Sequence, residues 1–276
     1  MAEGGCCQVQ WELLDAASLS AAASDKSDKT DGPGGLCVVP LGVLEKHGRH
    51  LPLGTDVICA HSIALRAAEI EPAVVFPCFI FGQIAEARHL PGAVSVAPEL
   101  YGPMLGATLD EIGRNGFKKI ILYNFHGGNV NWLRFFVDCL PREQKSYLTY
   151  LYDVLVPPEA LDSLETCNGH ACELETSLML YLRPNHVNME KIPANPAEPQ
   201  DRLQDLPLAK TPLNWYADFP EHYAGDARKA SAKKGKLIYE ACAAKLAKFY
   251  RSVKEDGQLQ KLDAEFFSRV EKIGIK

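Results

Sequence analysis

Short apolar runs alternate with helical segments along most of this chain, and this alternation limits the folds it can adopt. The run from Leu36 to Gly42 is continuous and apolar, as in a strand that is buried on both faces. Further strands are predicted at 73–81, 120–123 and 147–155. Helices are predicted at about 57–70, 104–114, 129–140, 172–182 and 227–253. The pattern predicts an α/β fold with a mostly parallel central sheet that helices cover on both faces.

Three segments stand outside this alternation. Residues 8–17 are predicted to form a short opening element, and the polar stretch from about Ser18 to Gly35 is predicted to be a flexible surface insertion. Residues 184–222 are rich in proline and are predicted to be irregular. We therefore divide the chain into an N-terminal element with its insertion, residues 1–36, and one large domain, residues 37–276.

The composition and net charge limit the kinds of partner and the cellular compartment that we expect for this protein. The formal net charge is -6 and there is no long basic run, so a nucleic-acid partner is not expected. No apolar stretch is long enough to span a bilayer and no signal peptide is evident, so we expect no membrane partner. The nine cysteines are scattered without a C-x-x-C motif, which indicates reduced thiols in a cytoplasmic protein.

Three segments place residues of metal-ligand type beside the ends of predicted strands or helices. The first runs from Glu45 to Pro52 and continues to Asp56, directly after the first strand. The second runs from Asn124 to Asn129, directly after the third strand, and the third from His170 to Ser177, where a helix begins. In parallel α/β sheets, ligands bind at the carboxyl ends of the strands. Two segments sit at such ends, and the third can join them by folding over.

The residue types in these segments suit a pair of metal ions. Glu45, His47, Asp56 and His126 offer two carboxylates and two imidazoles, a mixed set that fits Zn, Mn or Fe. Two ions held close together need a carboxylate that bridges them. Asp56 is the candidate bridge, with Glu45 and His126 on one ion and His47 on the other.

The remaining polar residues of the three segments complete this hypothesis. The second ion would be short of protein ligands, and Glu175, or with less support Glu173, is the candidate to complete it. His170 is then available to carry a proton, a common task for a side chain that titrates near neutral pH. Gly127 and Gly128 allow the backbone to approach the site closely.

Ordinary structural roles compete with this interpretation. An isolated E-x-H motif is more often structural, and His61, His186 and His222 are expected to be surface residues. The H-G-G-N turn alone could be a tight connection that Asn129 caps, or could resemble the oxyanion turn of esterases. The esterase alternative needs a G-x-S-x-G elbow, which the chain lacks. The occurrence of all three segments together favours the metal site.

The order and spacing of the motifs resemble those of the creatininase (creatinine amidohydrolase) family. The matching segments are Pro40 to Asp56, Arg88 to Gly92, Asn124 to Asn129, His170 to Ser177 and Ala230 to Gly235. The resemblance implies a three-layer α/β/α sandwich with a dinuclear metal site. It also implies hydrolysis of C–N bonds in small amides, including cyclic ones. Many members assemble as hexamers, so a homo-oligomer is implied here.

The resemblance assigns roles residue by residue. Four positions match the metal ligands of the family, with the aspartate as the bridge: Glu45, His47, Asp56 and His126. His170 matches the histidine proposed for proton transfer, and Glu175 matches the glutamate of the E-T-S motif. His89 lies in the H-x-P-G segment and is expected to face the substrate, together with Gly127 and Gly128.

The chain departs from the creatinine-cleaving members at informative positions. Gly128 stands where those members have a glutamate ligand, so one ligand must come from elsewhere, and Glu175 is the candidate. Tyr152 and Thr166 stand where two tryptophans close over the ring of creatinine, which weakens the case for creatinine itself. Tyr152 is nevertheless expected to contact the substrate.

The resulting functional hypothesis is a metal-dependent amidohydrolase that acts on a small or cyclic amide. One alternative uses the same site as a deformylase or peptidase of a biosynthetic pathway. The other alternative is an oligomeric binding protein without catalysis.

Overall fold

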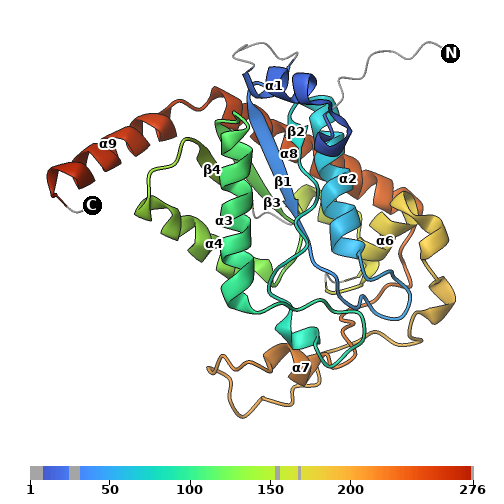
Figure 1. The fold of residues 1–276 in the computed structure, drawn as a ribbon. Helices are drawn as coiled ribbons and strands as arrows, with labels where there is room; N and C mark the ends of the chain where they lie inside the picture. Colours follow the sequence, from blue (N-terminus) through green and yellow to red (C-terminus); the bar gives the residue numbers. More distant parts are fainter. Residues whose placement is uncertain (1–8, 25–31, 153–155, 167–168, 275–276) are drawn as a thin grey trace, which may run out of the picture.

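The computed structural model describes residues 9–24, 32–152, 156–166 and 169–274, and a four-stranded parallel sheet lies at its centre (Figure 1). The strand order is β2-β1-β3-β4, and each neighbouring pair is parallel. The strands are β1 (Leu36–Leu41), β2 (Val74–Val75), β3 (Lys119–Asn124) and β4 (Leu148–Tyr152). All six residues of β1 are buried, which explains why its sequence is continuously apolar.

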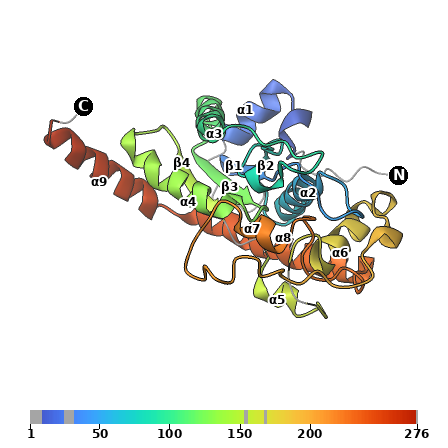
Figure 2. The same cartoon turned by 90° about the horizontal axis from the view of Figure 1, so that it is seen from below.

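Helices cover both faces of the sheet, as Figure 2 shows from below. One face contacts α2 (Thr55–Ile70), α6 (Glu173–Leu182) and α8 (Ala232–Glu255), which share a core with Val38 and Ile121. The other face contacts α1 (Ala16–Ser24), α3 (Pro98–Arg114) and α4 (Asn129–Cys139), which share a core with Cys37 and Ile120. Successive strand residues therefore serve opposite cores, and the three-layer α/β/α sandwich is confirmed.

Several predicted boundaries differ from the observed ones. The strand predicted at 73–81 is reduced to the two residues of β2, with one further bridge between Leu41 and Phe79. The fourth strand occupies Leu148–Tyr152, and residues 153–155 of its predicted range lie outside the described residues. Helix α3 begins earlier than predicted because Pro98 suits the first helical position. Helix α8 begins later, at the residue after Ser231, whose hydroxyl accepts the Lys234 N–H as a cap.

The regions predicted to lack regular structure contain short helices. Helix α1 occupies the alanine-rich start of the predicted insertion, and residues 25–31 of the insertion lie outside the described residues. The proline-rich segment contains η4 (Pro184–His186), η5 (Met189–Lys191) and α7 (Asn214–Asp218). The other short elements are η1 (Trp11–Leu13), η2 (Ala85–Ala87), η3 (Leu140–Arg142) and α5 (Pro158–Leu161).

The last helix, α9 (Gln258–Lys272), was not predicted, and it projects from the body of the molecule in Figures 1 and 2. None of its residues is buried, and Leu262 and Phe266 are exposed. Over the described residues, no helix combines the length and the apolar character that crossing a membrane requires.

Candidate metal centre

Four of the predicted ligands meet at the carboxyl ends of the central strands. Glu45 and His47 follow β1, His126 follows β3, and Asp56 is the second residue of α2. All four are buried, with at most 6% of any one exposed. Burying two carboxylates and two imidazoles is costly unless they pair with one another or bind an ion, so the cluster is a functional candidate.

The first part of the cluster consists of Glu45, Asp56 and His126, and it brings three atoms with lone pairs together. The Nδ1 atom of His126 lies 3.1 Å from Glu45 Oε1 and 2.9 Å from Asp56 Oδ2. The Nε2 atom of His126 donates to the backbone carbonyl of Gln83 at 2.9 Å, so Nδ1 carries the lone pair in the neutral ring. Glu45 Oε1 and Asp56 Oδ2 are both buried without a hydrogen-bond partner. A divalent cation satisfies all three atoms, so these residues fit a metal.

The second part of the cluster consists of His47, Asp56 and Glu175, so it shares Asp56 with the first part. The other oxygen of Asp56, Oδ1, lies 3.0 Å from Nε2 of His47, and Glu175 Oε1 lies 3.7 Å from that nitrogen. The Nδ1 atom of His47 faces the backbone carbonyl of Glu45 at 3.3 Å, which leaves Nε2 as the atom that can bind an ion. Asp56 thus presents one oxygen to each imidazole, as a bridging carboxylate must.

The structure shows which of the two candidate glutamates, Glu173 or Glu175, lies near the cluster. Glu173 accepts hydrogen bonds from the backbone and hydroxyl of Thr166 at 2.8 and 2.7 Å, and it forms an ion pair with Lys234. Glu175 instead approaches His47. Helix α6 begins at Glu173 rather than at His170, and this later start turns Glu175 toward the cluster.

His170 lies beside the second part of the cluster. Its ring centroid is 4.3 Å from that of His47, and its Nε2 donates to the backbone carbonyl of Lys46 at 2.8 Å. Burial, and then the charge of His47, lower the pKa of His170. A neutral ring with its proton on Nε2 keeps a lone pair on Nδ1, which is the state that a general base requires.

The electrostatics of the cluster follow from its opposite charges. Burial raises the pKa of Glu45, but the charge and hydrogen bond of His126, together with the hydrogen bond of His222, outweigh it and hold that pKa well below its usual range. Burial lowers the pKa of His126, but Glu45 and then Asp56 outweigh it and hold that pKa well above its usual range. The carboxylates therefore favour positive charge at their centre, whether it comes from protons or from a metal ion.

Our expectation that His222 is a surface residue is wrong. It is 2% exposed, and its Nε2 lies 2.6 Å from Glu45 Oε2. It comes from the segment predicted to be irregular, which the bridge between His170 and Ala224 draws into the site. This pairing is long-range, so no local sequence signal marked His222. His186 is exposed as expected, and His61 is half-buried.

A cavity of about 600 Å³ opens onto the cluster. Gly127 and Gly128 are among the residues that line it. His89 lies outside the lining, exposed, with Nε2 donating to the carbonyl of Pro220 at 2.7 Å. Tyr152 also lies outside it, buried in the core that α2, α6 and α8 form with the sheet.

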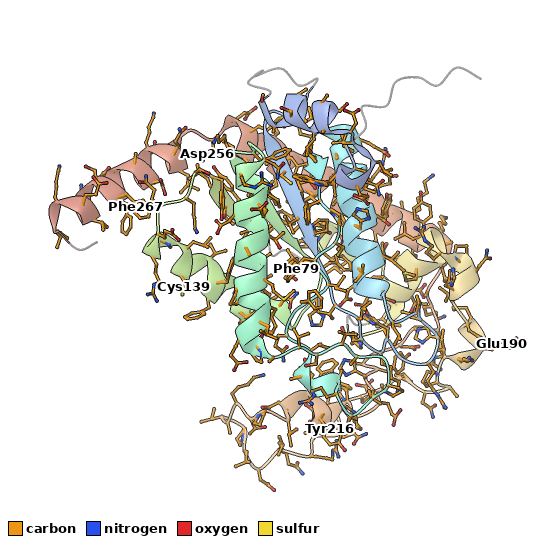
Figure 3. All side chains as sticks on the ribbon, in the orientation of Figure 1. Phe79, Cys139, Glu190, Tyr216, Asp256 and Phe267 are labelled. Carbon is orange, nitrogen blue, oxygen red and sulfur yellow. The ribbon has the colours of Figure 1, made fainter. Side chains whose placement is uncertain are left out.

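The aromatic walls of the cavity come from residues that the sequence analysis did not place there. Trp132 of α4 and Trp215 of α7 both line it. Helix α7 lies beyond the end of the sheet in Figure 1, and Figure 3 labels its Tyr216 there. The expected cap of α4 also differs, because Asn129 is the first helical residue and its side-chain oxygen accepts the Trp132 indole N–H at 2.8 Å.

The atoms around residue 128 leave no room for a side chain, so this position requires glycine. A Cβ at this position would lie 2.5 Å from the carbonyl oxygen of Gln83 and 2.6 Å from Nε2 of His126. Any side chain would therefore break the hydrogen bond that orients His126. A glutamate ligand cannot occupy this position without moving Gln83, which agrees with Glu175 filling the second part of the cluster.

The buried side chain of His50 is expected to make the free energy of unfolding depend on pH. Its Nε2 lies 2.9 Å from the Thr176 hydroxyl, and burial lowers its pKa to about 4. In the unfolded chain a histidine titrates near 6.5, so between about pH 6.5 and pH 4 the unfolded state binds more protons. Stability is therefore lost as the pH falls through this window, by an amount of order 2 kcal/mol after a discount for solvent screening.

Urea denaturation of His50→Gln and wild type at pH 7 and pH 4.5 measures this contribution. We expect the variant to lose less stability than the wild type between the two values. The exposed His186→Gln serves as the control and should match the wild type. An equal loss in all three proteins would contradict the assignment.

Comparison with known proteins supports these observations. Residues 21–250 match the family model for creatininase, described as creatinine amidohydrolase. The creatinine amidohydrolase of Pseudomonas putida is 27% identical over 236 residues, which cover 77% of this chain and 88% of that protein. The mycofactocin precursor peptide peptidase of Mycobacterium tuberculosis (strain CDC 1551 / Oshkosh) is 30% identical over 221 residues, which cover 74% and 80% respectively.

A solved structure titled "Creatininase Mn" has the same fold, with a TM-score of 0.75 and 23% sequence identity. The match covers 90% of this chain and 99% of that one. The chain therefore belongs to the creatininase family of hydrolases, which act on amide C–N bonds.

Proposed function

We propose that the protein is a metal-dependent amidohydrolase that cleaves a C–N bond in a short peptide or peptide-like amide. The observation that carries the metal dependence is Asp56, whose two oxygens face the imidazoles of His47 and His126. The substrate class rests on the cavity, because about 600 Å³ is the size of a site for a drug-sized ligand and far exceeds a single small ring.

The residues divide into two ligand sets. Glu45, Asp56 and His126 would hold one ion, and His47, Asp56 and Glu175 the other. Zn, Mn or Fe would suit these mixed ligands, and the similar solved structure is a manganese form. When bound, such a pair of ions lowers the pKa of a water molecule and polarises a carbonyl.

His170 supplies the proton transfer. Its Nε2–H is fixed on the carbonyl of Lys46, so Nδ1 takes a proton from the attacking water and returns it to the leaving nitrogen. A neutral His170 is needed for the first of these steps, and the lowered pKa of His170 keeps the ring neutral near pH 7.

The cavity wall provides recognition. Trp132 and Trp215 offer aromatic faces to the substrate, and Lys210 is the one lysine or arginine among the lining residues that the structure describes. A peptide carboxylate can pair with the Lys210 ammonium while the amide bond lies at the metal cluster. This charge favours a peptide over creatinine, which has no carboxylate.

A substrate panel tests the proposal. It contains creatinine and other lactams, formamides, and short peptides with free or amidated C-termini, each assayed with zinc or manganese. We expect peptides with a free carboxylate to have the highest kcat/KM. Lys210→Ala should reduce that preference by about tenfold, the value of a partly desolvated ion pair. The matched control is Lys191→Ala, an exposed lysine outside the cavity, which should leave it unchanged.

Two results would reject the proposal. Creatinine as the best substrate would remove the peptide assignment. A metal-loaded protein that cleaves none of the panel would favour the binding-protein alternative.

A further inference from the structure

A chain of hydrogen bonds connects the substrate cavity to one of the candidate metal ligands through His222. The indole Nε1–H of Trp215, which lines the cavity, donates to Nδ1 of His222 at 2.9 Å. On the other side of the ring, Nε2 of His222 lies 2.6 Å from Oε2 of Glu45. Both bonds are shielded from water, since His222 is 2% and Glu45 1% exposed.

This arrangement fixes the tautomer of His222. An indole N–H can only donate, so Nδ1 must accept and the ring proton lies on Nε2. The Nε2–H then donates to Oε2 of Glu45, a short bond of the charge-assisted kind. It occupies Oε2 and leaves Oε1, the oxygen without a partner, turned toward His126.

We propose that His222 is a positioning residue that orients Glu45 as a metal ligand, and that Trp215 holds His222 in the tautomer this task requires. His222 could also be considered a ligand, because a ring nitrogen of His222 lies within 4.8 Å of donor atoms of Glu45 and His170. Both of its nitrogens are already engaged, however, so neither has a lone pair for an ion. Glu45 is thus the ligand and His222 its support.

The backbone of His222 supports a specific role. Its φ of 53° lies in the left-handed region, which non-glycine residues rarely adopt. Two hydrogen bonds hold this conformation: His222 N–H to the carbonyl of Phe219 at 3.0 Å, and Gly48 N–H to the carbonyl of His222 at 3.1 Å. Such strained residues concentrate at functional sites, where the surrounding structure holds them in place.

Trp215 belongs to the cavity wall and to the support of Glu45 at once, so a change at this wall residue also reaches the metal cluster. The inference rests on the metal centre of the proposed function, but its test measures metal affinity and needs no substrate.

The test compares zinc affinities by competition with a chromophoric chelator. We expect His222→Ala to weaken the affinity about 10- to 100-fold, the usual effect of losing a group that orients a ligand. His222→Gln should recover most of this loss, because the glutamine amide places an N–H donor near the position of Nε2. Both variants carry the same backbone strain at a positive φ, so their difference reports the side-chain donor alone.

Trp215→Phe removes the indole donor and keeps an aromatic ring, and we expect zinc affinity to fall by about tenfold. Trp132→Phe is the matched control, since Trp132 also lines the cavity but donates to Asn129 instead. It should keep the zinc affinity of the wild type.

Wild-type affinity in His222→Ala would overturn the proposal. Complete loss of one bound ion in both His222 variants would also overturn it, because that result would make His222 a ligand. A wild-type protein that binds no zinc at all would reject the proposed function itself, and the positioning role with it.

Discussion

Replacing Asp56 with asparagine is expected to remove both metal ions and to lower kcat/KM by at least about 10³-fold, since bound metal supplies several kcal/mol of transition-state stabilisation. The two oxygens of Asp56 lie 3.0 Å from His47 Nε2 and 2.9 Å from His126 Nδ1. Asparagine has a single carbonyl oxygen and turns an NH₂ group toward one of the two ions. It also removes a negative charge from the centre of the cluster.

Elemental analysis of the purified variant, together with turnover of the best substrate, measures this effect. The matched control is Asp226→Asn, another buried aspartate, which pairs with Arg228. That variant should keep its metal even if it is less stable. Two retained ions in Asp56→Asn would contradict the bridging role.

Replacing His170 with alanine is expected to lower kcat by about 10²- to 10⁴-fold while both ions stay bound. The expected loss is that of a proton carrier, because the two proposed ligand sets do not include His170. The direction of the pH effect follows from the lowered pKa of His170. Wild-type kcat should fall on the acidic side, below pH 6.5, as His170 becomes protonated, and this limb should be absent in the variant.

Metal content and the pH profile of kcat separate the possible roles of His170. A ring nitrogen of His170 lies within 4.8 Å of donor atoms of His47 and Glu175, so the loss of one ion in His170→Ala would make it a ligand. An acidic limb that persists in the variant would show that another group carries the proton. His186→Ala, at an exposed position, should change neither quantity.

The part of the site that the sequence predicts well follows from the geometry of parallel sheets. Glu45 and His47 follow one buried strand and His126 follows its neighbour, so the common direction of the strands brings them to one edge. Asp56 joins them because α2 begins after a short turn. Local sequence patterns were enough here, since each residue lies within one turn or strand end of a clear element.

The rest of the site depends on contacts between distant segments. His222 and Trp215 come from a segment without periodicity, and the pairing of His170 with Ala224 fixes where that segment lies. The choice between Glu173 and Glu175 depended on the residue at which α6 begins, and helix boundaries are poorly defined by sequence.

The aromatic cavity wall was missed for a related reason. The family resemblance implies tryptophans in the creatinine-cleaving members only at the positions of Tyr152 and Thr166. The described structure places Trp132 and Trp215 around the cavity from different elements, α4 and α7. An aromatic surface can therefore be supplied from new positions, and its loss at one aligned position does not establish its loss from the site.

The metal content of the wild-type protein, purified without added chelator and measured by elemental analysis, tests the central claim most directly. The arrangement of Glu45, His47, Asp56, His126 and Glu175 predicts about two divalent transition ions per chain. A protein that contains none, and takes up none when titrated with zinc or manganese, would contradict the dinuclear centre.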